Sequence, residues 1–137
     1  ARDLIVEVAE ESAVRELEPD LGWVASQPGL GMIVTSRSND AAYDFVSRYF
    51  APKAGIDEDR VCGSAHCCLA PYWGKRLSKT GLIGHQISAR GGVVLVAWEN
   101  DRVRLSGKAI TVLNGELSEA ASPTPADKGS EAVPAAG

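Results

Sequence analysis

The chain has few cysteines, no glycosylation acceptor and no long hydrophobic run. Three cysteines occur in 137 residues, and two of them, Cys67 and Cys68, are adjacent, so the sequence lacks the disulfide framework of a small secreted protein. It contains no Asn-x-Ser/Thr motif. The longest apolar run, residues 93–98, is far too short to cross a bilayer, and no signal-like segment opens the chain. We therefore expect a cytoplasmic protein that does not contact a membrane.

Basic residues are too few and too scattered to form a nucleic-acid-binding surface. Eighteen acidic and fourteen basic side chains give a formal net charge of -4. Nucleic-acid-binding domains usually concentrate Lys and Arg on one face, so nucleic acid is excluded as an expected partner. Hydrophobic residues make up 45% of the chain, which is enough for one ordinary core.

The hydrophobic pattern predicts strands around one long helix. Over residues 64–77 the apolar residues recur at steps of three and four, which is typical of a helix with a wide buried face. Two short helices are expected within residues 10–18 and 21–26, and residues 51–60 are interpreted as an irregular loop. Strand-like stretches occupy residues 4–8, 30–36, 43–50, 83–89, 93–98, 103–105 and 109–113. This order indicates an α+β domain with a mainly antiparallel sheet.

The segment before and within the first turn of the long helix is the main candidate site. Gly63 allows the backbone to turn sharply, and Ser64 can cap the helix. The free amides that follow, together with the positive end of the helix dipole, suit a carboxylate or an enolate. The alternative is an ordinary capped helix that binds no ligand.

Two side chains beside this turn are candidates for proton transfer. A thiol at a helix N-terminus ionises readily, so Cys62 is a candidate acid/base, with an inert packed thiol as the alternative. Asp59 lies three residues earlier and can position an ammonium group or relay a proton, although residues 57–59 also fit a solvated acidic run. Cys62 and His66 lie four residues apart, but no second ligand pair follows. We therefore expect no metal, and expect His66 to pack or cap within the helix.

These residues resemble those of a known family. The sequence YDFVSRYFAPKAGIDEDRVCGSAHCCLAPYWGKRL, followed by HQISARGG and VRLSGKAITVLNGEL, strongly resembles the C-terminal half of phenazine biosynthesis PhzF-like proteins. The densest part is E-D-x-V-x-G-S-A-H with the downstream S-x-R-G-G. The resemblance implies the diaminopimelate epimerase-like fold, in which two α+β lobes, each a sheet wrapped around a central helix, enclose the active site. It also implies an isomerase that moves a proton on a small amino-acid-derived carboxylate without a cofactor.

The resemblance assigns roles to individual residues. Asp59 matches the family's active-site aspartate, and Gly63 and Ser64 match the turn that holds the substrate carboxylate; the amide of Ala65 completes this expected oxyanion site. Two departures are Arg60, where the family usually has proline, and Cys62, where it often has threonine. The segment C-G-S-A is similar to the thiol-bearing C-G-[ST]-G of diaminopimelate epimerases and proline racemases, so Cys62 is expected to line the pocket.

The same resemblance places the principal acid/base, a glutamate, in a first lobe that this chain does not contain. We expect residues 1–117 to form the C-terminal lobe and residues 118–137 to form a disordered tail. The lobe would then need an N-terminal lobe or a second copy as partner. The alternative function is a catalytically inactive half-site pseudo-enzyme or a protein-interaction module. Residues 90–92 are interpreted as a tight turn between strands, with a pocket border as the alternative.

Overall fold

The computed structural model describes residues 3–116, and the predicted disordered tail lies outside the described residues. In the described part, seven strands form one sheet in the order β1-β2-β3-β5-β6-β7, with β4 paired to β3. Pairs β1–β2 and β3–β5 are parallel, and the other pairs are antiparallel. The strands are β1 (Asp3–Glu7), β2 (Gly31–Arg37), β3 (Phe45–Ala51), β4 (Ile56–Asp59), β5 (Gly81–Gln86), β6 (Gly92–Glu99) and β7 (Arg102–Ser106). The predicted α+β class with a mainly antiparallel sheet is confirmed.

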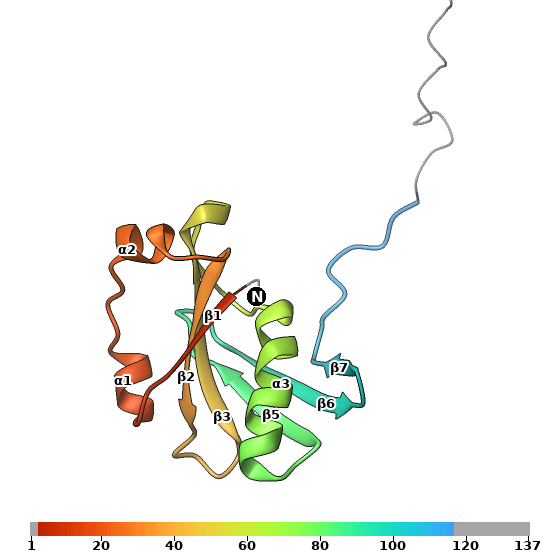
Figure 1. The fold of residues 1–137 in the computed structure, drawn as a ribbon. Coiled ribbons are helices and arrows are strands. Elements are labelled where there is room, and N and C mark those ends of the chain that lie inside the picture. Colours follow the sequence, from red (N-terminus) through yellow and green to blue (C-terminus); the bar gives the residue numbers. More distant parts are fainter. Residues whose placement is uncertain (1–2, 117–137) are drawn as a thin grey trace, which may run out of the picture.

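Helices cover the two faces of the sheet unequally. The long helix α3 (Gly63–Leu77) lies along one face, and the short helices α1 (Glu11–Arg15) and α2 (Leu21–Ser26) lie on the other side (Figure 1). A 3-10 turn, η1 (Pro52–Ala54), connects β3 to β4. No helix within residues 3–116 is long and apolar enough to cross a membrane.

Alternating strand residues explain why the sheet wraps around α3. Successive side chains of a strand point to opposite faces, so every second apolar residue can meet the helix. Ala65, Leu69 and Trp73 of α3 belong to one core cluster with apolar residues from six strands. Those strand residues include Ile5, Ile33, Phe45, Leu82, Val94 and Leu105. A second cluster on the opposite face joins Val14 of α1 and Val24 of α2 to Val34, Val46 and Phe50.

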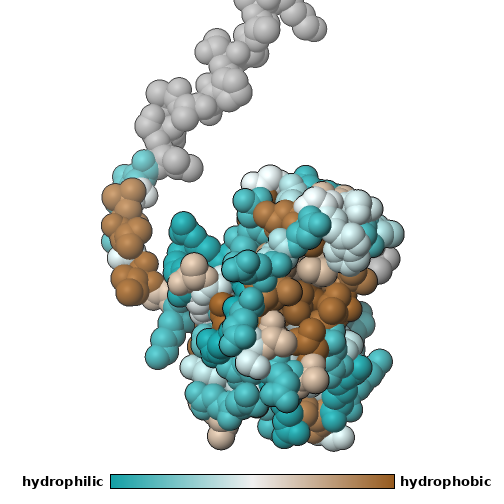
Figure 2. Space-filling model, turned by 90° about the vertical axis from the view of Figure 1, so that its left-hand side faces the viewer, coloured by the Kyte–Doolittle hydropathy of each residue, from teal (hydrophilic) through white to brown (hydrophobic). Residues whose placement is uncertain are grey.

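Two predictions about strands are wrong. Residues 51–60 were expected to be irregular, yet they contain β4, which pairs with β3 through Ile56↔Ala51 and Asp59↔Tyr49. Residues 109–113 have a strand-like pattern but form no strand. Ile110, Val112 and Leu113 are 88%, 92% and 83% exposed. Figure 2 shows hydrophobic side chains along this extended segment, which stands away from the body.

The central helix should provide much of the stability. Leu69 is fully buried against the sheet, so we expect Leu69→Ala to lower the free energy of unfolding by about 2–5 kcal/mol. The matched control is Cys67→Ala, which changes an exposed residue of the same helix and should alter stability by less than about 0.5 kcal/mol. Urea titration measures both values, and equal stability of the two variants would contradict this packing.

Candidate functional site

The start of α3 is uncapped by any side chain. Cys62 is the N-cap residue, with extended backbone angles of φ -99 and ψ 112, and it makes no side-chain capping bond. Ser64 was predicted to cap, but it is the second helical residue, and its hydroxyl oxygen lies 3.2 Å from the sulfur of Cys62. Gly63 is exposed and does not have the positive φ of a sharp turn. Within the described residues, the amides of Gly63, Ser64 and Ala65 therefore face no side-chain acceptor.

A buried glutamine fixes the loop that leads into this helix. The side-chain oxygen of Gln86, at the end of β5, accepts a hydrogen bond from the Cys62 amide at 2.8 Å. Its side-chain nitrogen donates to the Asp59 carbonyl oxygen at 2.7 Å. Gln86 is fully buried, so these bonds are shielded from water. One side chain thus holds both ends of the segment between β4 and α3, and we call this pair of bonds the Gln86 clamp.

His66 supports the same turn from inside the helix. It is fully buried, and its Nδ1 lies 2.8 Å from the Cys62 carbonyl oxygen. Because a carbonyl oxygen only accepts, Nδ1 carries the hydrogen and donates it. Burial lowers the pKa of His66, since the charged imidazolium is disfavoured away from water, and the bond to the Cys62 carbonyl opposes this only in part. His66 is therefore a neutral core histidine, as expected from the sequence.

The two predicted proton-transfer residues are placed differently. Asp59 ends β4 and is half-buried, and within residues 3–116 its carboxylate has no hydrogen-bond or ion-pair partner. Cys62 is only 8% exposed and packs in the main core cluster. Gln86 therefore links the backbone of Asp59 to that of Cys62 at the helix start, while the thiol of Cys62 is turned largely inward.

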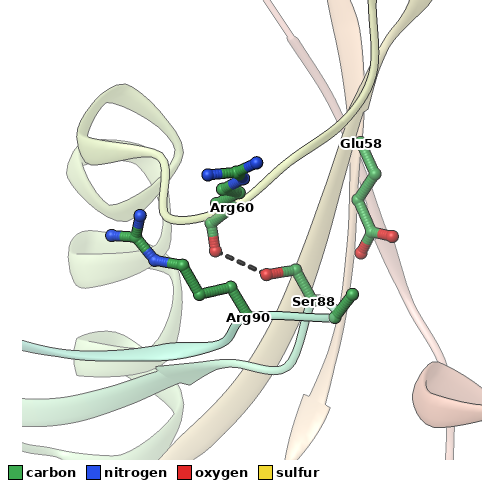
Figure 3. A pocket seen from close by; sticks show the side chains of 5 residues that line it. Glu58, Arg60, Ser88 and Arg90 are labelled. Carbon is green, nitrogen blue, oxygen red and sulfur yellow. Dashed lines mark hydrogen bonds between the residues drawn. The ribbon is translucent and has the colours of Figure 1, made fainter.

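An open pocket of about 490 Å³ lies beside this turn, lined by Glu58, Arg60, Ser88, Ala89 and Arg90 (Figure 3). The hydroxyl of Ser88 donates to the Arg60 carbonyl oxygen at 2.6 Å and connects the two walls. Asp59, Cys62 and Gly63 do not line it. Of residues 90–92, Arg90 and Gly91 lie between β5 and β6, whereas Gly92 begins β6, and Arg90 also borders the pocket.

Sequence reasoning missed Gln86 and Ser88, because their bonds reach residues 24 to 28 positions away. The signal that was present is the motif S-x-R-G-G, which contains Ser88 and Arg90. Within the described residues, no group of three or more His, Cys, Asp or Glu side chains is placed to hold a metal ion.

Comparison with known proteins identifies close relatives of this chain. The PhzC-PhzF family, described as phenazine biosynthesis-like protein, matches residues 1–115. An uncharacterized isomerase of Halalkalibacterium halodurans is 44% identical over 115 residues, covering 84% of this chain and 43% of the relative. An uncharacterized isomerase of Pseudomonas aeruginosa is 47% identical over 114 residues, covering 83% of this chain and 43% of the relative. The chain spans less than half the length of these curated relatives.

Solved structures agree with the sequence matches. A phenazine biosynthesis PhzC/PhzF protein from Clostridium difficile superimposes with a TM-score of 0.76 at 35% identity, covering 86% of this chain and 45% of the other. A PhzF-family protein from Enterococcus faecalis gives a TM-score of 0.71 at 41% identity, covering 81% of this chain and 45% of the other.

Removal of the Gln86 clamp should destabilise the helix start. We expect Gln86→Leu to lower the free energy of unfolding by about 2–4 kcal/mol, because each buried polar group left unpaired costs about 1–3 kcal/mol. Hydrogen exchange at the Cys62 amide should also accelerate. Gln27→Leu is the control, since the side-chain bonds of Gln27 are exposed. Unchanged stability and unchanged exchange at Cys62 in the Gln86 variant would contradict the clamp.

Acidification should destabilise the fold through its histidines. The pKa of folded His66 lies below the ordinary value of 6.5, so the unfolded chain binds a proton that the folded chain does not. Stability therefore decreases as pH falls below 6.5 and is fully present above it. The pKa of His85 is also lowered by burial, so His85→Asn separates the two contributions.

The measurement is urea titration from about pH 7.5 to about pH 5.5, with an NMR titration of each imidazole. A His66 ring that titrates at or above 6.5 would overturn the assignment.

Proposed function

The chain belongs to the phenazine biosynthesis-like PhzC-PhzF family, and from that premise we propose that it is the carboxylate-binding lobe of a cofactor-independent isomerase. Its solved relatives are PhzF-family proteins, which have the diaminopimelate epimerase-like fold. Curated relatives of about twice its length bear the name isomerase. The observation that carries the proposal is the uncapped start of α3, whose first-turn amides meet no side-chain acceptor.

The first role of this lobe is to bind a small amino-acid-derived carboxylate. The amides of Gly63, Ser64 and Ala65 sit at the positive end of a 15-residue helix, where an anion is stabilised by both the N–H groups and the dipole. Exposure of Gly63 leaves the approach open. When a proton leaves the carbon next to the carboxylate, the electrons of the C–H bond delocalise onto the carboxylate oxygens. The same amides then stabilise the enolate-like charge.

The second role is to assist proton transfer. Asp59 has an unpaired, half-buried carboxylate, and the Gln86 clamp holds its backbone beside the turn. It can accept or return the proton of a substrate group held at the helix start. Cys62 lines the inner side of this turn, with its thiol against the Ser64 hydroxyl. The principal acid/base comes from an N-terminal lobe in this proposal, so we expect the chain alone to be nearly inactive.

Solvent deuterium incorporation tests the role of Asp59. The chain is incubated in heavy water with a pool of the common amino acids, and mass spectrometry measures deuterium at each α-carbon. We expect slow exchange that Asp59→Asn reduces by about 100-fold, the lower end of the range for a lost acid/base. Asp57→Asn, in the same acidic run, is the control and should exchange at the parent rate. Efficient exchange that Asp59→Asn leaves unchanged would overturn the mechanism.

One observation favours a second candidate function, a non-catalytic interaction module. Residues 109–113 carry highly exposed apolar side chains, and such a segment commonly finds a partner. A second copy of this chain would cover the segment. Light scattering at micromolar concentration is the test. A dimer that Ile110→Lys dissociates supports this candidate, and a stable monomer removes it.

A further inference from the structure

The pocket beside α3 contains two cations without anionic partners. Arg60 and Arg90 line it, and within residues 3–116 neither side chain has an ion-pair partner. The one acidic residue of the pocket, Glu58, is already engaged by Arg48 through bonds of 2.7 and 3.0 Å. Figure 3 shows both guanidinium groups on the side of the pocket away from Glu58. The local positive charge of the two arginines is therefore uncompensated.

Backbone contacts hold together the two segments that carry Arg60 and Arg90. The Ser88 hydroxyl donates to the Arg60 carbonyl at 2.6 Å and accepts from the Gly91 amide at 3.2 Å, so it bridges the two segments. Gly91 has a φ of 67, which favours glycine. A Cβ atom on Gly92 would lie 2.5 Å from a methyl carbon of Val61, so glycine is required for this close approach. The turn after β5 is thereby held against the residues that enter α3.

Two unpaired guanidinium groups at one open pocket suit an anionic group with two oxygens. Arginine presents a planar fork that binds a carboxylate through two parallel bonds, and these charge-assisted bonds are stronger than neutral ones. Like charges at one pocket repel, and an anion bound between them offsets that repulsion. Arg60 precedes the N-cap residue of α3 by only two positions, so the pocket adjoins the uncapped helix start.

We propose that Arg60 and Arg90 bind a second carboxylate of the substrate, so that this lobe selects amino-acid-derived dicarboxylates over monocarboxylates. The inference rests on the proposed function, in which the first carboxylate lies on the amides of Gly63, Ser64 and Ala65. Arg60 and Arg90 then act as specificity-determining residues, and the proton-transfer step itself does not involve them.

Matched pairs of amino acids test this selection. L-Glutamate is compared with L-glutamine, and L-aspartate with L-asparagine, because each pair differs by one carboxylate. Amide NMR of the chain at constant ionic strength measures the dissociation constants. We expect at least one acid to bind about fivefold or more tightly than its amide. Shifts should occur at Gly63 to Ala65 with both members of a pair, and at residues 88–91 with the acid alone.

Variants of Arg60 and Arg90 test whether these two side chains cause the preference for the acid over its amide. Arg60→Gln and Arg90→Gln should each remove most of the preference while leaving the affinity for the amide unchanged. Arg60→Lys and Arg90→Lys should retain part of it, since the charge remains and the fork is lost. Arg102→Gln, on the exposed end of β7, is the control for net charge and should keep the full preference.

The outcomes separate this inference from the proposed function. Equal affinity for acid and amide with shifts at α3, or a preference that persists in both Gln variants, overturns the dicarboxylate site and leaves the carboxylate-binding turn intact. A preference for the acid with shifts at residues 88–91 and none at α3 supports the arginine site and contradicts the proposed function. No shift with any of the four amino acids overturns both.

Discussion

The Gln86 clamp is the constraint on which the rest of the site depends. The loop between β4 and α3 carries Asp59, Arg60 and the N-cap Cys62, and loops of this kind have few local bonds of their own. Gln86 supplies two bonds from a strand of the sheet, one to each end of the loop, and the bond to the Cys62 amide is buried. Because β5 pairs on both sides, with β3 and β6, the clamp transfers the rigidity of the sheet to the helix start.

Other buried polar bonds extend this anchoring along α3. His66 donates to the Cys62 carbonyl, and the indole nitrogen of Trp73 donates to the Thr35 hydroxyl at 3.0 Å. Thr35 in turn donates to the Val46 carbonyl at 2.6 Å. Buried polar groups are costly when unpaired, so these bonds favour one rotational setting of the helix over others with similar apolar contact. The helix start is thereby held in place without a capping side chain.

The sequence predicts the fold class and α3 well, because both depend on hydrophobic periodicity that a single segment displays. The sequence pattern does not predict β4, because the acidic residues 57–59 are typical of a solvated loop. They form part of a strand through pairing with β3. The sequence pattern also wrongly predicts a strand at residues 109–113. This segment has no partner strand in the described part of the chain. The role of the helix-start turn stays a prediction from local motif and family resemblance. The Gln86 clamp and the Arg60–Arg90 pair were not predicted, since both join residues 24 to 30 positions apart.

Under the proposed function, the charges of this lobe suit binding better than base catalysis. A positive helix end and two unpaired guanidinium groups stabilise an anionic substrate and its enolate-like state. In this proposal, Asp59 assists a proton transfer that a base from another lobe initiates. The two lobes therefore divide the work in this proposal: this lobe stabilises the anionic state, and a base on the other lobe removes the proton.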